Sequence, residues 1–333
     1  MHRIFQVATV AFALAWSGGL AAQPQQGPHV ERFDPALDQL IAPGTKIERV
    51  ATGFTFTEGP LWHKGRLWFS DVRGDKLRAL SRDGRVKVLI DKAGGAVNPP
   101  PGANMGPNAM VPAPDGTVLL VQMGARRISR IDSHLGLHPF LSTYHGKRFN
   151  SPNDLVYDRD GSLWFTDPPF GLVGMDKDPA KELPFSGVFR YANGKLKAVI
   201  TDLTLPNGIG FSPDWKTLYV SNSGPDRFVR AYHVGADGRL SNPRDLIHYP
   251  AGNDPDVPDG LKVDERGDVW STGPGGIRII SPTGRVLGQI KLPEVAANLA
   301  FAEDGHTLYI TASTSVYRLH TKVKGELPLY YKR

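Results

Sequence analysis

The stretch SPNDLVYDRDGSLWFTDPP, residues 151–169, decides the fold. Its Pro-Asn-Asp stands in front of two apolar runs, and Asp160-Gly161 joins them. An Asp-Gly pair between two such runs is a strong hairpin signal, because both residues tolerate the backbone conformations of a tight turn. The stretch therefore predicts an antiparallel strand pair with an amide and a carboxylate at its open end.

The same phrase returns five more times along the chain. The copies are EGPLWHKGRLWFSD from Glu58, NAMVPAPDGTVLLVQM from Asn108, NGIGFSPDWKTLYVSN from Asn207, DGLKVDERGDVWSTG from Asp259 and NLAFAEDGHTLYITA from Asn298. In every copy, ten to twelve residues separate the first polar residue from a large apolar residue of the returning run. Further strand pairs with turn signals lie between the copies, which makes four strands in each repeat of about forty to fifty residues. This period predicts an all-β protein, a six-bladed β-propeller of four-stranded blades.

The two ends of the propeller are expected to close the ring together. After SVYRLH, residues 315–320, too little chain remains to supply an outermost strand for the sixth blade. KIERVATG, residues 46–53, precedes the first phrase and can supply it. Such closure removes an open sheet edge that would invite aggregation. The propeller domain is therefore expected over residues 45–333, with a leader over 23–44 that contains a helical turn near 35–41.

The N-terminus has the pattern of a secretory signal peptide. One Arg precedes a short apolar run from Ile4 to about Trp16, and small residues follow up to Ala22. The run is too short for a spanning helix, so we expect a signal peptide over residues 1–22 and no stable membrane insertion after its cleavage. The mature protein is expected to be exported, either periplasmic or secreted.

Composition excludes several functional classes. The chain has no Cys, which excludes disulfides, thiol nucleophiles and thiolate zinc sites. Its net charge of +6 comes from scattered basic residues, so no nucleic-acid partner is expected. Neither a G-x-S-x-G nor an H-E-x-x-H stretch occurs, which argues against serine hydrolases and zincins.

The first polar residues of the phrases are expected to meet at the channel, because the first strand of each propeller blade lines the axis. A single Asn-Gly is typical of a turn, but the turns proper lie elsewhere, at pairs such as Asp160-Gly161. A turn would also gain nothing from a Glu at the equivalent place. The residues expected around the mouth are Glu58, Asn108, Asn153, Asn207, Asp259 and Asn298.

Two carboxylates with amide oxygens, and no His or Cys, describe a site for a hard divalent cation. Ca²⁺ fits such a protein cage better than Mg²⁺, while Mn²⁺, Fe²⁺ and Zn²⁺ remain alternatives. Asp167 ends the second strand of its phrase and should face the same mouth, where it is a candidate substrate contact or proton acceptor.

Motifs throughout the chain resemble one known family. FTEGPLW (56–62), SPNDLVYDRDGSLWFTDPPFGL (151–172), LPNGIGFSPD (205–214), PDGLKVDERGDVW (258–270) and NLAFAEDG (298–305) resemble the gluconolactonases, regucalcin (senescence marker protein) and luciferin-regenerating enzyme, above all their exported bacterial gluconolactonase-like branch. The resemblance covers residues 33–320.

The resemblance implies one catalytic divalent metal in the channel of a six-bladed propeller. The implied ligands are Glu58, Asn207 and Asp259, and Asp259 is also the implied base. Asn153 matches a ligand or substrate contact, and Asn108 matches a polar position of the pocket.

One position departs from the pattern of the resembled family. Regucalcin-like members carry an Arg two residues before the third-blade Asn, where this chain has Ser151. Arg148 is close by but out of register, and is taken as a candidate substrate contact. The departure concerns the identity of the substrate more than the chemistry.

The expected activity is the metal-dependent opening of a small lactone, such as a sugar lactone. Asp259 either accepts the proton of the attacking water or only positions it while Asp167 accepts the proton. Two alternatives are hydrolysis of organophosphates or other activated esters at the same site, and a binding propeller with a structural calcium and no enzymatic activity.

Overall fold

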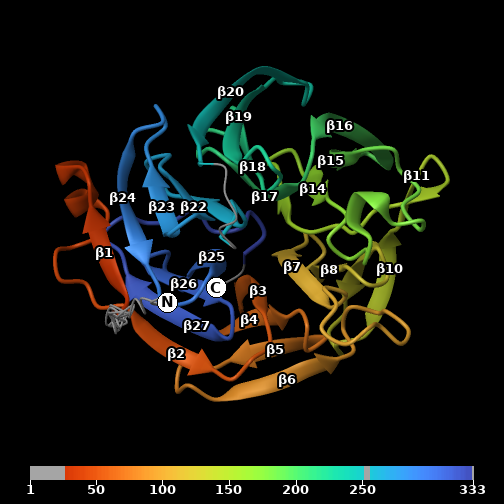
Figure 1. The fold of residues 1–333 in the computed structure, drawn as a ribbon, viewed down its shortest axis with the longest axis horizontal. Helices are drawn as coiled ribbons and strands as arrows, with labels where there is room; N and C mark the ends of the chain where they lie inside the picture. The colour runs from red at the N-terminus through yellow and green to blue at the C-terminus, as the bar shows by residue number, and fades with distance from the viewer. Residues whose placement is uncertain (1–26, 251–255, 332–333) are drawn as a thin grey trace, which may run out of the picture.

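The six repeated phrases form the inner strands of six sheets that surround a central channel (Figure 1). The structure is a computed structural model, in which residues 27–250 and 256–331 are described. Each sheet is antiparallel, and its first strand lies nearest the axis. The predicted all-β, six-bladed propeller is therefore confirmed. The expected signal peptide, residues 1–22, lies outside the described residues.

Blades one to three follow the chain in order. Their strands are β3 (Thr57–His63), β4 (Arg66–Asp71), β5 (Lys76–Leu80) and β6 (Val86–Asp91); β7 (Pro107–Pro112), β8 (Val118–Gln122), β9 (Arg127–Ile131) and β10 (Leu137–Leu141); and β13 (Leu155–Tyr157), β14 (Leu163–Asp167), β15 (Ser186–Ala192) and β16 (Lys195–Leu203). A separate hairpin of β11 (Thr143–Tyr144) and β12 (Lys147–Arg148) precedes blade three.

Blade four also follows the chain in order, whereas blades five and six each include one strand from the N-terminal side. Their strands are β17 (Pro206–Phe211), β18 (Thr217–Asn222), β19 (Phe228–Val234) and β20 (Leu240–His248); β21 (Leu261–Val263), β22 (Val269–Gly273), β23 (Gly276–Ile280), β24 (Val286–Lys291) and β1 (His29–Arg32); and β25 (Ala296–Ala302), β26 (Thr307–Ala312), β27 (Ser315–His320) and β2 (Glu48–Thr52). Each set is one continuous sheet.

The ring closes as the sequence predicts. β2 pairs with β27, with Glu48 opposite Arg318, and completes the sixth blade (Figure 1). The first strand of the ring and the last blade therefore share one sheet, which leaves no open seam between blade six and blade one.

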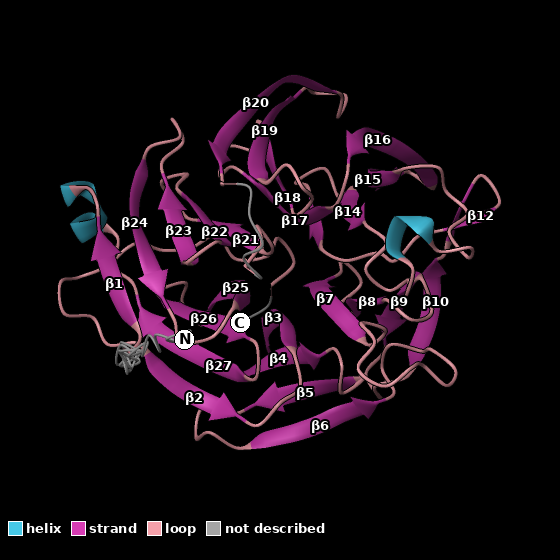
Figure 2. Cartoon of the chain, in the orientation of Figure 1, coloured by secondary structure: helices cyan, strands magenta, loops and turns pink. Residues whose placement is uncertain are grey.

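The leader segment is more ordered than the sequence indicated. β1 adds a fifth strand to blade five by pairing with β24, and a short 3-10 helix, η1 (Pro35–Gln39), follows where a helical turn was expected (Figure 2). Leu37, Leu40 and Ile41 are buried against blades five and six. The four residues of β1 show no clear alternation of apolar and polar side chains, so the sequence does not predict a strand there. β1 forms because β24 offers it an unpaired edge.

Aromatic residues of the repeat fill the spaces between blades. Trp164 packs edge-on against Phe211 of the next blade at 5.6 Å, and Trp270 packs in the same way against Phe301 at 5.5 Å. Both Trp side chains are fully buried. The shared aromatic register thus holds the ring together and does not form a binding platform.

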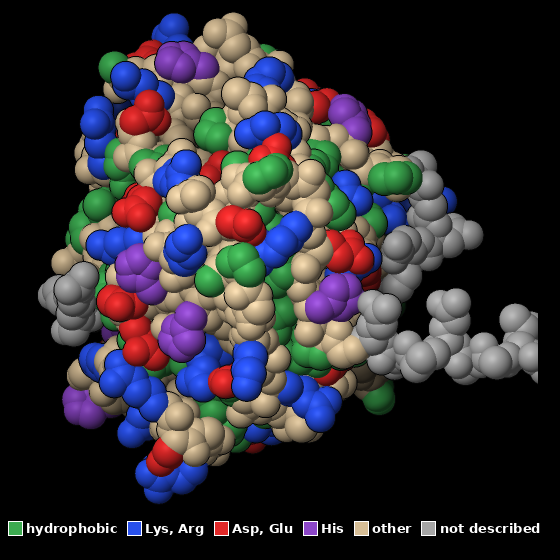
Figure 3. Space-filling view, turned by 90° about the vertical axis from the view of Figure 1, so that its left-hand side faces the viewer, with side chains coloured by type: hydrophobic (Ala, Val, Ile, Leu, Met, Phe, Trp, Pro, Cys, Tyr) green, Lys and Arg blue, Asp and Glu red, His purple; other side chains and the backbone are tan. Residues whose placement is uncertain are grey.

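Two short 3-10 helices, η1 and η2 (Met175–Lys177), occur in the described part of the chain, and neither has the length or apolar character needed to cross a membrane (Figure 2). Charged side chains of both signs are interspersed on the face drawn in Figure 3. That face therefore carries no continuous basic stripe of the kind that binds nucleic acid.

Candidate functional site

The four predicted ligand residues lie at the start of the innermost strands of blades one, three, four and five. Glu58 and Asn207 are the second residues of β3 and β17, whereas Asn153 and Asp259 stand two residues before β13 and β21. Glu58, Asn153 and Asn207 are buried, and Asp259 is partly exposed. The propeller therefore brings residues as distant in the chain as Glu58 and Asp259 to one end of the channel.

The carboxyl groups of Glu58 and Asp259 lie close enough to affect each other. Burial raises the pKa of Glu58 to about 7, although the Gly59 N–H and the Asn298 amide donate hydrogen bonds to Oε2. Burial also raises the pKa of Asp259 well above its usual value, and the neighbouring Glu58 and Asp154 carboxylates raise it further. Such crowding disfavours negative charge unless a cation offsets it.

Amide oxygens at the same end of the channel lack partners. The Oδ1 atoms of Asn207 and Asn108 are buried and accept no hydrogen bond from the described residues. The Asn207 amide nitrogen donates to Ser223 Oγ at 3.0 Å, and that of Asn108 contacts Met123 Sδ at 3.4 Å. Buried acceptors without donors are rare, and a bound cation would satisfy that of Asn207.

The donor set therefore fits a hard cation. Among the described residues, no three His, Asp or Glu side chains come together as a metal site, so a cation would depend on the Glu58 and Asp259 carboxylates and on amide oxygens. Oxygen donors of both kinds are what Ca²⁺ takes in proteins, and this set contains none of the nitrogen or sulfur ligands that zinc prefers.

Asn298 supports this arrangement from the sixth blade. Its amide nitrogen donates to Glu58 Oε2 at 3.0 Å, and its Oδ1 accepts from the Leu299 N–H at 2.9 Å and from Lys262 Nζ at 3.4 Å. Because both ends of the amide are engaged within the protein, Asn298 orients Glu58.

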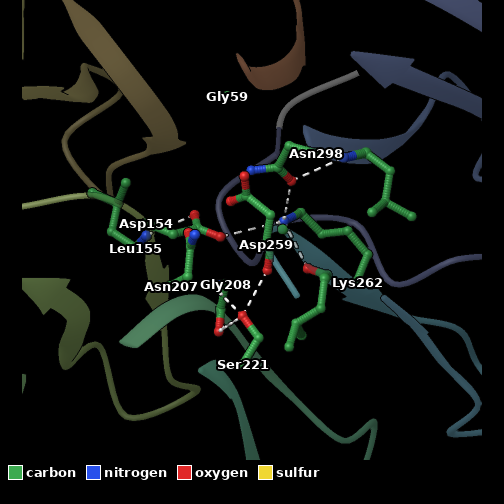
Figure 4. Close-up of polar contacts among 12 residues, drawn as sticks. Gly59, Asp154, Leu155, Asn207, Gly208, Ser221, Asp259, Lys262 and Asn298 are labelled. Atoms are coloured by element: carbon green, nitrogen blue, oxygen red, sulfur yellow. Dashed lines mark hydrogen bonds and ion pairs between the residues drawn. The ribbon is translucent and has the colours of Figure 1, made fainter. Parts of the chain in front are cut away.

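Asp154 and Lys262 are residues of the site that sequence reasoning missed (Figure 4). Asp154 is buried next to Asn153, and its Oδ2 lies 3.8 Å from Lys262 Nζ. Burial raises the pKa of Asp154, and the Lys262 ammonium opposes this effect. The signal was a lone Lys in the short apolar run GLKV, directly after Asp259.

A cavity continues along the inner strands from this polar cluster. It has a volume of about 100 Å³, and Asp154, Lys262 and Asn298 line it together with apolar residues of the first strands. Glu326, Leu327, Pro328 and Leu329 line it as well. The cavity therefore extends from the polar cluster to the C-terminal segment that contains Glu326.

Asp167 holds the loop that carries Asn153. It is fully buried, and its two carboxyl oxygens accept hydrogen bonds from the Asn150 and Ser151 N–H groups, both at 2.8 Å. Burial raises its pKa to about 7. The structure thus places this carboxyl beneath the loop, with both oxygens engaged by the main chain.

The last residues of the second strands in blades one and four also accept hydrogen bonds from the main chain before a predicted ligand. Asp71 accepts from the Thr55 and Phe56 N–H groups at 2.9 and 3.2 Å, and Asn222 accepts from the Leu205 N–H at 2.9 Å. The anchored peptides lie just before Glu58 and Asn207.

Arg148 lies apart from these residues. It is exposed on β12, and its main-chain N–H donates to Glu182 Oε2 at 2.7 Å. The other predicted pocket residue, Asn108, is buried at the start of β7.

Comparison with known proteins gives one consistent result. The family model of the SMP-30/Gluconolactonase/LRE-like region matches residues 56–314. A gluconolactonase from Zymomonas mobilis is 36% identical over 312 residues, which are 89% of this chain and 87% of that protein.

Solved structures agree with this result. A gluconolactonase from Xanthomonas campestris superposes with a TM-score of 0.77 at 29% identity, covering 90% of this chain and 98% of the other. Regucalcin from Agrobacterium tumefaciens, a calcium-binding protein, superposes with a TM-score of 0.67 at 18% identity, covering 86% and 98% of the two chains, and this likeness shows the fold alone.

Proposed function

Because this chain belongs to the SMP-30/gluconolactonase/LRE-like family, we propose that it is a lactonase that opens a sugar lactone or related small lactone with the help of a divalent cation. One observation carries the proposal. Glu58 and Asp259 converge at the channel beside the unpartnered Oδ1 of Asn207. A propeller that only bound partner proteins would gain nothing from crowding two carboxylates at its axis.

The substrate class is supported by the relatives. The Zymomonas mobilis protein, a gluconolactonase, matches this chain over most of the length of both. The Xanthomonas campestris structure, also of a gluconolactonase, superposes on 90% of this chain. The lactone is therefore the first substrate class to test.

Glu58, Asn153, Asn207 and Asp259 would hold the cation, and Ca²⁺ is the ion that their oxygen donors suit best. A bound divalent cation would act as a Lewis acid toward the lactone carbonyl oxygen and help to orient water. Mn²⁺, Fe²⁺ and Zn²⁺ are the alternatives that the experiment below distinguishes.

The residues of the chain would supply the remaining functions. The Asp259 carboxylate would take a proton from the attacking water, because the other candidate, Asp167, has both oxygens occupied by main-chain donors. Asn108 and Asn153 would contact oxygen atoms of the lactone, such as those of its hydroxyl groups. Asn298 would keep Glu58 in place through its amide hydrogen bond.

We also propose that the protein is exported. The support is the N-terminal sequence pattern alone, with its short apolar run and small residues before Gln23. Fractionation of cells that express the full chain, followed by N-terminal sequencing of the product, tests this proposal.

The decisive experiment for the activity uses chelator-stripped protein. Turnover of a panel of sugar lactones and of a panel of phosphotriesters is measured before and after addition of Ca²⁺, Mn²⁺, Fe²⁺ or Zn²⁺. We expect lactone opening that returns with Ca²⁺. Turnover restricted to phosphotriesters would replace the proposed substrate class, and full lactone turnover without any cation would refute the metal requirement.

A further inference from the structure

Buried hydroxyl groups recur at one register position of the propeller. The second-to-last residue of the second strand is Ser or Thr in five of the six blades, which are all described: Ser70, Thr166, Ser221, Thr272 and Thr311. All five side chains are fully buried. Blade two has Val121 at this position. The hydroxyl groups lie at the height of the candidate site, because the strands that carry them run beside the innermost strands.

In blade four the hydroxyl joins two of the proposed ligands (Figure 4). Ser221 Oγ accepts a hydrogen bond from the Gly208 N–H at 2.8 Å and donates one to the Asp259 carbonyl oxygen at 2.6 Å. Gly208 directly follows Asn207 in the chain. A single hydroxyl therefore connects the backbone of the blade-four ligand to that of the blade-five ligand.

Blade three repeats this bridge. Thr166 Oγ1 accepts from the Asp154 N–H at 3.1 Å and donates to the Asn207 carbonyl oxygen at 2.8 Å. Asp154 follows Asn153, so this hydroxyl connects the ligands of blades three and four.

Neighbouring blades extend the series in part. Thr272 Oγ1 accepts from the Asp259 N–H at 3.1 Å and donates to the Ala297 carbonyl at 3.2 Å, next to Asn298. Ser70 Oγ donates to the Asn108 carbonyl at 2.6 Å. At the boundary after blade two, where the hydroxyl is replaced by Val121, the Ala109 N–H donates to the Asn153 carbonyl at 3.3 Å.

We propose that Thr166 and Ser221 are positioning residues of the cation centre, which fix the spacing of Asn153, Asn207 and Asp259 across the blade boundaries. This inference rests on the proposed function. The carbonyl carbon that each hydroxyl restrains is bonded to the Cα of a ligand residue, so the direction of that side chain is restrained with it. Removal of a residue that orients a metal ligand through a hydrogen bond commonly lowers the affinity for the metal.

The test compares three variants of the full chain. S221A removes the hydroxyl but leaves the direct hydrogen bond from the Gly208 N–H to the Asp259 carbonyl, at 3.1 Å, so the blades stay joined. S221T keeps a hydroxyl and copies the residue found in blades three and five. S129A is the matched control, because Ser129 on β9 is equally buried and donates to Gln122 Oε1 at 2.6 Å, away from the proposed ligands.

The measurements are Ca²⁺ affinity by calorimetry, kcat and KM on a lactone that the wild-type protein opens, and the exchange rate of the Gly208 amide in metal-free protein. For S221A we expect a loss of about tenfold or more in Ca²⁺ affinity and in kcat, and faster exchange at Gly208. S221T should restore all three, and S129A should match the wild type in affinity and kcat.

Either of two results would overturn the proposal: wild-type affinity and turnover in S221A, or an equal loss in S129A. If S221A does not fold, T166S and T166V provide the same test in blade three. The proposal then requires wild-type Ca²⁺ affinity in T166S, which keeps the hydroxyl, and a loss of affinity in T166V, which lacks it. A wild-type protein that binds none of the four cations and opens no lactone would refute the proposed function instead. The Gly208 exchange rate in metal-free S221A would still show whether the hydroxyl restrains this blade boundary.

Discussion

At the scale of single residues, two requirements explain the start of the repeated phrases: a polar side chain at the hub, and room for the backbone of the next blade. The polar side chain faces the hub, and in three blades a Gly follows it. A Cβ on Gly208 would lie 2.4 Å from the Asp259 carbonyl oxygen of the next blade, closer than real Cβ atoms come to other atoms. Asn-Gly in the phrase NGIG therefore reflects the approach of a neighbouring blade, whereas true turn glycines such as Gly161, with a φ of 82°, lie between the strands.

Replacement of Asp259 by Asn tests its role as base. The substitution removes a negative charge and the atom that would accept the proton, so kcat should fall by about 10² to 10⁴ while the fold is kept. Steady-state kinetics at saturating Ca²⁺, with calorimetry to confirm that the cation is bound, measure the effect. A D259N protein with bound Ca²⁺ and full turnover would remove Asp259 from the chemistry and leave it as a ligand only.

Protons should compete with the cation at Glu58. Its pKa in the metal-free protein is raised to about 7 from an ordinary value of 4.5, so the folded state binds the proton more tightly than the unfolded state does. The contribution of Glu58 to the free energy of unfolding of the metal-free protein is fully present below pH 4.5 and is lost as the pH rises through 7. Ca²⁺ affinity should change in the opposite direction and fall as the pH drops through 7, with release of protons on binding.

Calorimetry in two buffers of different ionisation enthalpy measures this release at pH 6 and pH 8.5. More protons should be released at pH 6 than at the higher pH. Equal release at both values would show that Glu58 is already ionised in the metal-free protein.

At the scale of elements, the ends of the second strands position the site. Asp71, Asp167 and Asn222 each accept main-chain hydrogen bonds from the segment that precedes a ligand residue. From its place at the end of a strand, Asp167 is expected to face the mouth, but its carboxyl oxygens instead accept hydrogen bonds from the loop main chain. The pleat of a strand does not reveal whether its last side chain turns toward a ligand or toward the backbone of a neighbouring loop.

Substitution of Asp167 by Asn should therefore weaken the fold more than the chemistry. Asn offers one acceptor oxygen where the carboxylate offers two, so one of the Asn150 and Ser151 N–H groups loses its partner. The free energy of unfolding should fall by about 1–3 kcal/mol, as urea denaturation can show. The kcat of D167N should stay well above that of D259N, and the reverse order would make Asp167 the proton acceptor.

Hairpins and ring closure could be predicted because turn pairs and strand spacing are local. Asp160-Gly161 marks its hairpin, and the missing outer strand of blade six identifies β2 as its partner. β1 could not be predicted, because its pairing depends on the free edge of β24 and not on its own residues. The Asp154–Lys262 ion pair was missed for a similar reason, since it joins blades three and five across the channel.

At the scale of the whole molecule, cation binding should stabilise the ring. One ion would bind ligands from four blades, so unfolding of any of these blades would release the ion. At a Ca²⁺ concentration one hundred times the dissociation constant, the gain is about 2.7 kcal/mol. Calorimetric melting of chelated protein with and without added Ca²⁺ should show a higher Tm with the ion, and E58Q should show a much smaller shift. An unchanged Tm at millimolar Ca²⁺ would count against a cation at the hub.

Closure by β2 also determines the order in which the chain can fold. Glu48 and Arg318, which are bonded across this sheet, are 270 positions apart, so β2 is synthesised early and remains without its partner until nearly all other strands exist. Contacts between such distant segments form slowly. During that interval the edges of β2 and β27 are both open to pairing with other chains. Nascent and partly unfolded molecules should therefore be vulnerable to aggregation at this sheet, as they should be at blade five, where β1 waits for β24.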